Sequence, residues 1–225
     1  MLNHEQSEIH SFTHCHPEFD FSTPSFGQFY SLGVKAGPDF SYITNNPSDE
    51  NFETVPLVGI QGGLVNNFKV SRLFSVQVEA LFIQKGFKVK ALNIYDQGNE
   101  IWLRMNYLSL PVLARFTFPA GSFTFSGLAG GFCAYALNGR YTVKYNQEEP
   151  DKSDVEFGNI RHFDAGVCAG AGVGFRVGPG DLFIDFRFDY GLTVYNDWRY
   201  LGSGDHAFYS YCLGLGYLFH SGMKN

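Results

Sequence analysis

The stretch HFDAGVCAGAGVGFRVGPGDLFIDFRFDYG, residues 162–191, decides the fold that we predict from the sequence. It contains two runs in which apolar residues alternate with polar or small ones, and a Gly-Pro-Gly turn joins them. A period of two sends successive side chains to opposite faces of a strand, so the stretch is predicted to form a β-hairpin. We centre its turn on Pro179-Gly180. The resulting cross-strand pairs are Gly174 with Asp185, Gly172 with Arg187 and Gly170 with Asp189.

The two faces of this hairpin have opposite chemistry. One face is apolar and carries Phe163, Ala165, Val167, Ala169, Ala171, Val173, Phe175, Val177, Leu182, Ile184, Phe186, Phe188 and Tyr190. The other carries glycines and every charge, namely Asp164, Arg176, Asp181, Asp185, Arg187 and Asp189. A charged face relieved by glycines suits the crowded interior of a small barrel. The apolar face is therefore predicted to contact lipid.

The composition of the chain supports a β-rich barrel. Among 225 residues, 17% are aromatic, 26 are glycine and only 17% are charged. The chain has no run of the roughly 18 to 20 apolar residues that a transmembrane helix needs, so a barrel is the remaining way to span a membrane. The net charge of −6 excludes a basic surface for nucleic acid. We expect one barrel domain at 28–225 after a flexible tail at 1–27.

The rest of the chain continues the alternating pattern. Counting the hairpin arms as the sixth and seventh, eight strands are predicted, the others at 28–44, 55–70, 73–88, 101–117, 122–145 and 206–219. Residues 122–145 are ambiguous as to which face points inward, and Pro111 is a candidate bulge. Long connections are expected at 45–54, 89–100, 146–157 and 196–205, and short ones between them. This rhythm is typical of an antiparallel up-and-down outer-membrane barrel with tight turns and both termini in the periplasm.

Aromatic residues bracket the apolar stripes. In the last strand, Tyr209 and Tyr211 lie near one end and Tyr217 and Phe219 near the other. Two such belts are expected where a barrel meets the two membrane interfaces.

Four segments together resemble the PorT-like group of outer-membrane β-barrel proteins from Bacteroides-type bacteria. They are GVKAGPDFSY, VQVEALFIQKGFKVK, MNYLSLPVLARF and AGVGFRVGPGDLFIDFRFDYGLTVYND. The resemblance implies an outer-membrane barrel of about eight strands and transfers no catalytic residue. Some members of that group are linked to protein secretion, a role that the resemblance does not carry to this chain.

The inward charges form the candidate site. They are Lys35, Glu79, Arg115, Asp164, Arg176, Asp185, Arg187 and Asp189. Such a set either fills the lumen as paired charges or lines a translocation path, and we favour the filled lumen because a small barrel packs its interior. Arg187 is predicted to pair with Glu79 across the lumen.

Two other functions stay open. A hydrolase would draw on polar residues at the outer rim, namely His162, Asp197, Ser203, Asp205 and His206, although no nucleophile motif supports them. A soluble barrel for a small apolar ligand would need its charges on the outer face. We predict no catalytic residue, cofactor or metal site, and a structural or interaction role. The expected partners are outer-membrane lipid and, through the four long loops, other envelope proteins.

The cysteines and the N-terminus carry weaker signals. Cys133, Cys168 and Cys212 are expected to be packed strand residues, and a Cys168–Cys212 disulfide is conceivable because both share the inward face. The first 25 residues are polar and contain no signal peptide. A cluster of His10, His14, Cys15 and His16 is better explained as part of a tail than as a metal site.

Overall fold

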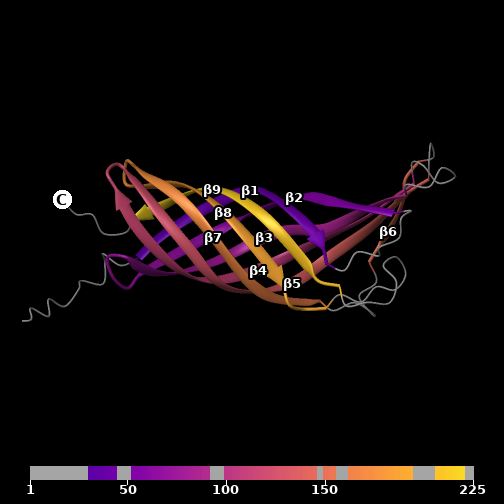
Figure 1. Cartoon of the computed structure of the whole chain (residues 1–225), viewed down its shortest axis with the longest axis horizontal. Helices are drawn as coiled ribbons and strands as arrows, with labels where there is room; N and C mark the ends of the chain where they lie inside the picture. Colours follow the sequence, from indigo (N-terminus) through magenta and orange to yellow (C-terminus); the bar gives the residue numbers. More distant parts are fainter. Residues whose placement is uncertain are drawn as a thin grey trace, which may run out of the picture.

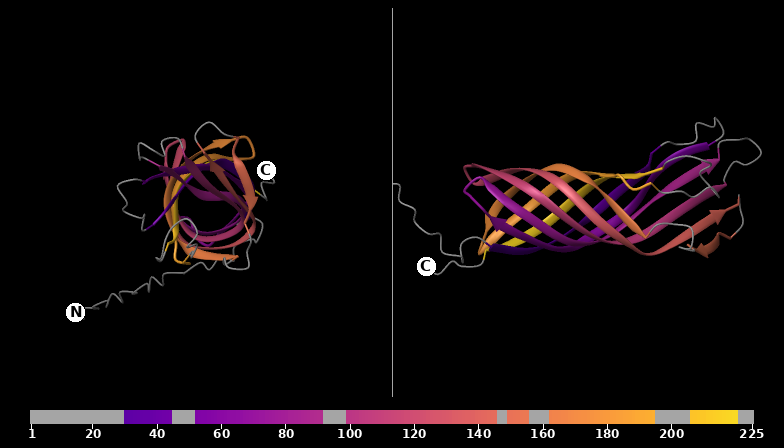
Figure 2. Two further views of the ribbon diagram at one scale, coloured as in Figure 1. Left: turned by 90° about the vertical axis from the view of Figure 1, so that its right-hand side faces the viewer. Right: turned by 90° about the horizontal axis from the view of Figure 1, so that it is seen from below.

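The computed structural model describes residues 30–44, 52–91, 99–145, 149–155, 162–194 and 206–220. These residues form one antiparallel sheet that closes on itself as a ring (Figures 1 and 2). The strands are β1 (Tyr30–Ile43), β2 (Phe52–Lys69), β3 (Phe74–Ala91), β4 (Glu100–Ala120), β5 (Phe123–Lys144), β6 (Asp151–Asp154), β7 (Phe163–Val177), β8 (Gly180–Gly191) and β9 (Phe208–His220). The predicted tail at 1–27 lies outside the described residues.

Eight of these strands make the barrel, as predicted. Their order around the ring is β4-β3-β2-β1-β9-β8-β7-β5, and the pairing of β5 with β4 closes it. β6 pairs only with β5, through residues 140–143. The prediction of an unstructured loop at 146–157 is therefore wrong at 151–154. This sequence, Asp-Lys-Ser-Asp, is polar on both faces and gives no alternating signal.

β2, β3 and β4 are each longer than predicted, and together with β5 they extend past the other strands at one end of the barrel (Figure 1). β2 begins at Phe52 and β3 ends at Ala91, so the predicted loops at 45–54 and 89–100 are shorter than expected. The short turns and the two ends of the described chain lie at the opposite end (Figure 1). Short turns mark the periplasmic end of an outer-membrane barrel, so the extension points outward from the cell.

Side chains alternate between the interior and the outer surface in the way that the sequence predicts. Glu79 on β3 is 1% exposed, whereas Phe82 three residues later is 38% exposed. On β4, Ser109, Leu113 and Arg115 are buried, whereas Leu110 and Val112 are about half exposed. At the level of the apolar band the outer surface thus carries apolar side chains and the buried charges point inward, the reverse of a soluble barrel.

The outer apolar surface has the height of a membrane. From Leu108 to Phe118, β4 rises about 33 Å, which is about 25 Å along the normal for a strand tilted by about 40°. Aromatic side chains cluster at both ends of this band: Tyr42 stacks on Tyr209 with ring centroids 5.0 Å apart, and at the other end Phe74 lies 5.2 Å from Phe116. In the described part of the chain no helix is long and apolar enough to cross a membrane.

The turn of the β7–β8 hairpin is centred one residue earlier than predicted. Gly178 and Pro179 form the turn and Val177 pairs with Gly180. Gly178 has a φ of +59°, which fits the first position of a type II′ turn, where glycine is preferred. Moving the centre of the turn by one residue shifts each cross-strand partner by two positions. Because side chains alternate with a period of two, every residue stays on its predicted face. Asp185 now lies opposite Gly172, and Arg187 opposite Gly170.

The β-bulge that was predicted at Pro111 of β4 lies on the neighbouring strand β5 instead. Pro111 keeps the register of its strand with β5, and the register shifts instead between Asn106 and Tyr107. The shift leaves Leu137 of β5 without a partner in the β4 register. Inward residues of β5 therefore have even numbers up to Ala136 and odd numbers from Gly139 on, which explains why the sequence of this strand was ambiguous.

Candidate functional site: a buried charge network in the barrel interior

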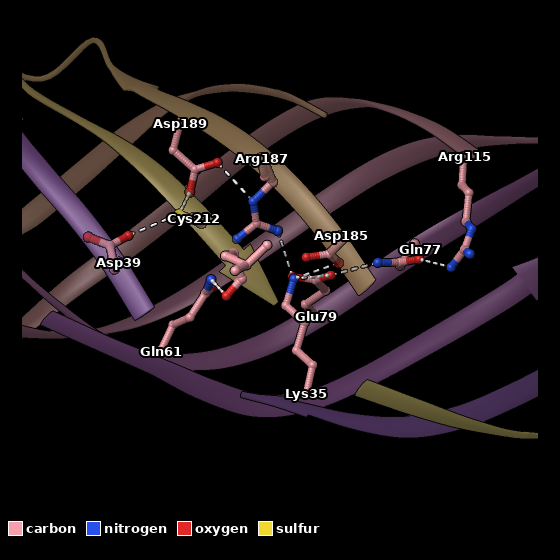
Figure 3. Close-up of polar contacts among 11 residues, drawn as sticks. Lys35, Asp39, Gln61, Gln77, Glu79, Arg115, Asp185, Arg187, Asp189 and Cys212 are labelled. Carbon is pink, nitrogen blue, oxygen red and sulfur yellow. Dashed lines mark hydrogen bonds and ion pairs between the residues drawn. The ribbon is translucent and has the colours of Figure 1, made fainter. Parts of the chain in front are cut away.

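Glu79 is the centre of the charged interior (Figure 3). Its carboxylate lies 3.0 Å from Lys35 Nζ of β1 and 2.8 Å from Arg187 Nη1 of β8. Gln77, two residues before it on β3, donates its amide N–H to the same carboxylate at 2.6 Å. All four side chains are buried. Three strands that are not neighbours in the ring thus meet at one carboxylate.

Two further contacts extend this centre toward the periplasmic end. Lys35 also lies 3.3 Å from Asp185 on β8. Arg115 of β4 donates to the side-chain oxygen of Gln77 at 2.9 Å, and its guanidinium lies 5.8 Å from the centre of the Phe183 ring. Gln77 therefore links Arg115 to Glu79 through one amide group.

A second group of acids lies on the other side of Arg187. Asp189 Oδ1 is 2.9 Å from Arg187 Nε, close enough for an ion pair although the N–H is not aligned as a hydrogen bond. Cys212 Sγ lies 2.9 Å from Asp39 Oδ2 and 3.7 Å from Asp189 Oδ2. A thiol has one hydrogen to donate, so it can serve only one of these carboxylates at a time.

Lys85 connects the charges to the apolar part of the interior. Its ammonium group lies 3.9 Å from Asp164 Oδ2 of β7 and 4.4 Å from the centre of the Phe132 ring. The ring face attracts the cation, and the carboxylate balances its charge. Lys85 is 2% exposed, so both contacts lie in the interior.

Glycines provide the space for these side chains. Asp185 lies between Gly172 of β7 and Gly214 of β9 in the two registers. A Cβ atom on Gly214 would overlap the Asp185 carboxylate. The prediction that glycines leave room for charged neighbours therefore applies to Gly214 and Asp185, in the register that the structure shows.

The interior holds nearly balanced charge. The buried cations are Lys35, Lys85, Arg115 and Arg187, and the buried carboxylates are Asp39, Glu79, Asp164, Asp185 and Asp189. Charges removed from water are tolerated when they are paired, and breaking one pair by removing a partner costs about 3 to 5 kcal/mol. The arrangement is able to hold distant strands in one register. A ring of cations around an open path would instead leave the charges in contact with water.

One predicted member of this network is misplaced. Arg176 has the inward parity of β7, but it lies next to the hairpin turn and is exposed. The periplasmic opening contains it in a cavity of about 970 Å³, together with Arg115, Asp181 and His220. Parity alone does not show how far a residue lies from the end of a strand, and the last turn of a barrel is open to water.

Asp39 and Lys85 are buried charges that the alternation of the sequence did not reveal. Asp39 follows Gly37-Pro38, which interrupts the visible alternation of β1. Lys85 follows Leu81 and Ile83, two apolar residues that also point inward, so the polar face of β3 is no longer evident at that position. Extending the parity of Lys35 and of Glu79 along their strands would have found both.

Apolar side chains fill much of the interior from the level of Arg115 to the loop end. They form one cluster that contains Ile43, Phe87, Val89, Leu103, Met105, Tyr107, Leu113, Leu128, Phe132, Ala134, Ala136, Tyr141, Val155, Cys168 and Phe208. Phe87, Leu103 and Met105 are fully buried. The extension of β2 to β5 is therefore packed inside as well as paired along its strands.

Of the five rim residues considered for a hydrolase, the structure describes only His162 and His206, and the two bond to different segments of backbone. His162 Nδ1 donates to the carbonyl of Ala136 at 3.2 Å, and His206 Nδ1 donates to the carbonyl of Thr44 at 3.1 Å. Each imidazole thus bonds to backbone through Nδ1. The remaining candidates, Asp197, Ser203 and Asp205, lie outside the described residues.

The cysteines of the described strands are free thiols. Cys168 and Cys212 are buried and Cys133 is exposed, so the Cys168–Cys212 disulfide considered above is not formed. Among the described residues no group of histidine, cysteine and acidic side chains could hold a metal ion. The cluster of His10, His14, Cys15 and His16 lies outside these residues.

Comparison with known proteins identifies the type of domain. A family model described as "Outer membrane protein beta-barrel domain" matches residues 22–195, which is more than half of the chain. No curated protein matches the chain.

Solved structures to which the chain shows some similarity include three from bacteria. Neisserial surface protein A is 13% identical, with 85% of this chain and 96% of that chain covered and a TM-score of 0.44. The attachment invasion locus protein Ail of Yersinia pestis is 15% identical, with coverages of 84% and 98% and a TM-score of 0.40. The transport unit of the autotransporter AIDA-I from Escherichia coli is 7% identical, with coverages of 91% and 93% and a TM-score of 0.36.

Proposed function

Because this chain belongs to the family of outer-membrane protein β-barrel domains, we propose that it is a closed, non-conducting barrel that anchors an interaction surface outside the cell. Its place is the bacterial outer membrane. The family match does not carry two parts of this proposal: that the lumen does not conduct, and that the outer end binds partners.

The packing of the interior is the observation that carries the proposal. Arg187, Lys85 and Phe87 are among the largest side chains of the described chain that are fully buried, and all three point into the lumen. A lumen that conducts ions needs water along its length and charges that face it. Here the charges of β1, β3 and β8 are paired with one another instead.

The outer end supports the second half of the proposal. β2 to β5 continue past the apolar band, and β6 adds a fifth strand to this extension. Strands that rise out of the membrane and carry polar residues on their outer face present a firm surface to partners, in addition to the loops. The resemblance to the PorT-like group remains a prediction and carries no role to this chain.

A conductance measurement tests the closed lumen. The purified barrel in a planar lipid bilayer is expected to give no current steps, whereas a known porin under the same conditions does. A conductance whose ion selectivity changes in Arg115→Gln would contradict the proposal, because a contaminating porin would not respond to that substitution.

Site-specific cross-linking tests the interaction surface. A photoreactive residue at Asp151, exposed on β6, is expected to give adducts with envelope proteins in intact cells. The same residue at Phe118, exposed near the periplasmic end of β4, is the matched control. Equal adducts at both positions, or none at Asp151, would mean that the extension is not the surface used.

A further inference from the structure

A row of amide side chains marks the upper edge of the apolar band on three neighbouring strands. Gln84, Asn106 and Asn138 are cross-strand partners on the outer face of β3, β4 and β5. Asn106 donates to Asn138 at 2.6 Å. One step toward the membrane, the outward residues are apolar, with Leu108 47% and Leu137 51% exposed. The row therefore lies where the hydrocarbon ends and the polar headgroups begin.

Above this row lies a cleft of about 1030 Å³. It is lined mostly by residues of the outer face, among them Lys88, Trp102, Arg104, Arg140, Lys152 and Asp154. Four of the lining residues are cations and one is an acid, although the whole chain has a net charge of −6. The cleft thus concentrates positive charge on an acidic protein.

Two of the cations face each other directly. Arg104 and Arg140 are cross-strand partners on the same face of β4 and β5. Like charges in this position destabilise a sheet unless an anion lies between them. Arg140 has a 3.3 Å contact with Asp154, but both side chains are largely exposed and such pairs contribute little. Arg104 has no ion pair within the described ranges.

The cleft also holds an unused hydrogen-bond donor. Trp102 Nε1 is buried and has no hydrogen-bond partner among the described residues, although it can only donate. The Trp102 ring lies against Lys88, whose ammonium group is 4.8 Å from the ring centre and 2.9 Å from Glu100. Trp102 lies four residues beyond Asn106, about 10 Å above the amide row, so its backbone is at the outer edge of the headgroup layer and its N–H can reach the polar end of a lipid only by pointing down into the cleft.

The height of the cleft matches the headgroup layer. Arg104 lies two residues beyond Asn106, which places it about 5 Å above the amide row along the membrane normal. The headgroup layer on each side of a membrane is about 5 to 8 Å thick. A lipid in contact with Leu108 and Leu137 therefore has its headgroup beside the two arginines.

We propose that this cleft binds the phosphate-bearing headgroup of an anionic lipid in the outer leaflet. The two guanidinium groups hold the phosphate from both sides, as arginine does in bidentate phosphate recognition. Trp102 Nε1 donates to a headgroup oxygen, and the acyl chains continue down the apolar face below the amide row. This inference rests on the placement in the outer membrane and is independent of what the lumen or the loops do.

Tryptophan fluorescence gives a direct test. The chain has two tryptophans, so Trp198→Phe leaves Trp102 as the only indole. This variant is placed in phosphatidylcholine vesicles that contain, at equal mole fraction, either phosphatidylglycerol or phosphatidylcholine brominated near the headgroup. We expect brominated phosphatidylglycerol to quench Trp102 several-fold more than brominated phosphatidylcholine.

Substitutions then assign the preference to the cleft. Arg104→Gln with Arg140→Gln is expected to make the two lipids quench equally, and Arg104→Gln alone to give an intermediate ratio. Arg72→Gln with Arg176→Gln, at the periplasmic end, is the control that keeps the preference. Migration on a gel before and after boiling shows that each variant is folded.

Two outcomes would overturn the proposal. Equal quenching by both lipids in the Trp198→Phe protein would show that the cleft does not select an anionic headgroup. A preference that survives the double substitution would place the selection elsewhere.

Discussion

Arg187 on β8 and Glu79 on β3 meet across the barrel interior, with Nη1 2.8 Å from Oε2 and both side chains buried. Their strands are separated by three others in both directions around the ring, so no backbone hydrogen bond joins them. The ion pair is therefore a connection through the lumen rather than along the wall. Its contribution can be measured without disturbing the sheet.

Removal of Arg187 is expected to destabilise the barrel strongly. Arg187→Met leaves Glu79 and Asp189 without this cation in a confined space, and the expected cost is about 3 to 5 kcal/mol. Glu79→Gln in the same chain should recover part of this loss. The measurement is urea unfolding from vesicles, with Arg72→Met, exposed in the β2–β3 turn, as the control. Additive effects of the two substitutions, with no coupling energy, would refute the pair as a stabilising contact.

Arginine on the outer face is expected to be costly in a depth-dependent way. Val173 and Ile184 are cross-strand partners on the outer face of β7 and β8. Val173→Arg and Ile184→Arg should each cost about 2 to 4 kcal/mol if they lie near the midplane. Val177→Arg, on the same face next to the turn, should cost only about 0 to 1 kcal/mol. Similar values for all three positions would mean that this face does not lie in lipid.

A methyl group at Gly214 is expected to disturb the charge network. The new Cβ would overlap the carboxylate of Asp185 and push it away from Lys35, so Gly214→Ala should cost about 1 to 3 kcal/mol. Gly127→Ala is the matched control, since a Cβ there meets nothing within 4 Å. We expect Gly127→Ala to change stability by less than about 0.5 kcal/mol. Equal effects in urea unfolding would show that Gly214 is not required for space.

Thiol labelling distinguishes the two faces of the barrel. In a Cys15→Ser chain, an apolar maleimide that enters the bilayer should modify Cys133, which is exposed on the outer face. Cys168 and Cys212 should react only after unfolding, because both lie in the interior. Mass spectrometry counts the labels. Rapid labelling of Cys212 in the folded barrel would contradict the packed lumen, and labelling of Cys133 by a charged reagent would contradict its contact with lipid.

Much of the wall could be predicted because strand parity depends on the sequence alone. Lys35, Glu79, Asp185 and Arg187 all fall on the buried face that their period of two assigns. The prediction of which side chains point inward failed where a bulge interrupts the alternation of a strand. The unpaired Leu137 reverses the inward parity of β5 partway along the strand.

Position along the barrel axis is harder to predict than the face. Arg176 shares its parity with Asp164 but lies at the open end of the strand, and only the three-dimensional register reveals this. The cleft near Arg104 was also missed. It depends on the cross-strand partner Arg140, which lies 36 positions away, and on β6, whose sequence has no alternation. Pairing of distant strands sets these contacts, and local sequence pattern does not encode it.

The separation of network residues along the chain has a consequence for how the barrel assembles. Lys35 and Glu79 are 44 positions apart, within the first three strands, whereas Glu79 and Arg187 are 108 positions apart. A growing sheet of β1 to β3 can form the first pair but holds Glu79 without its second partner. Arg187 lies on the opposite side of the ring, so it reaches Glu79 only when the sheet has curled far enough for β8 to face β3. An open sheet therefore holds this carboxylate with one of its two cations missing, and curling of the sheet supplies the second.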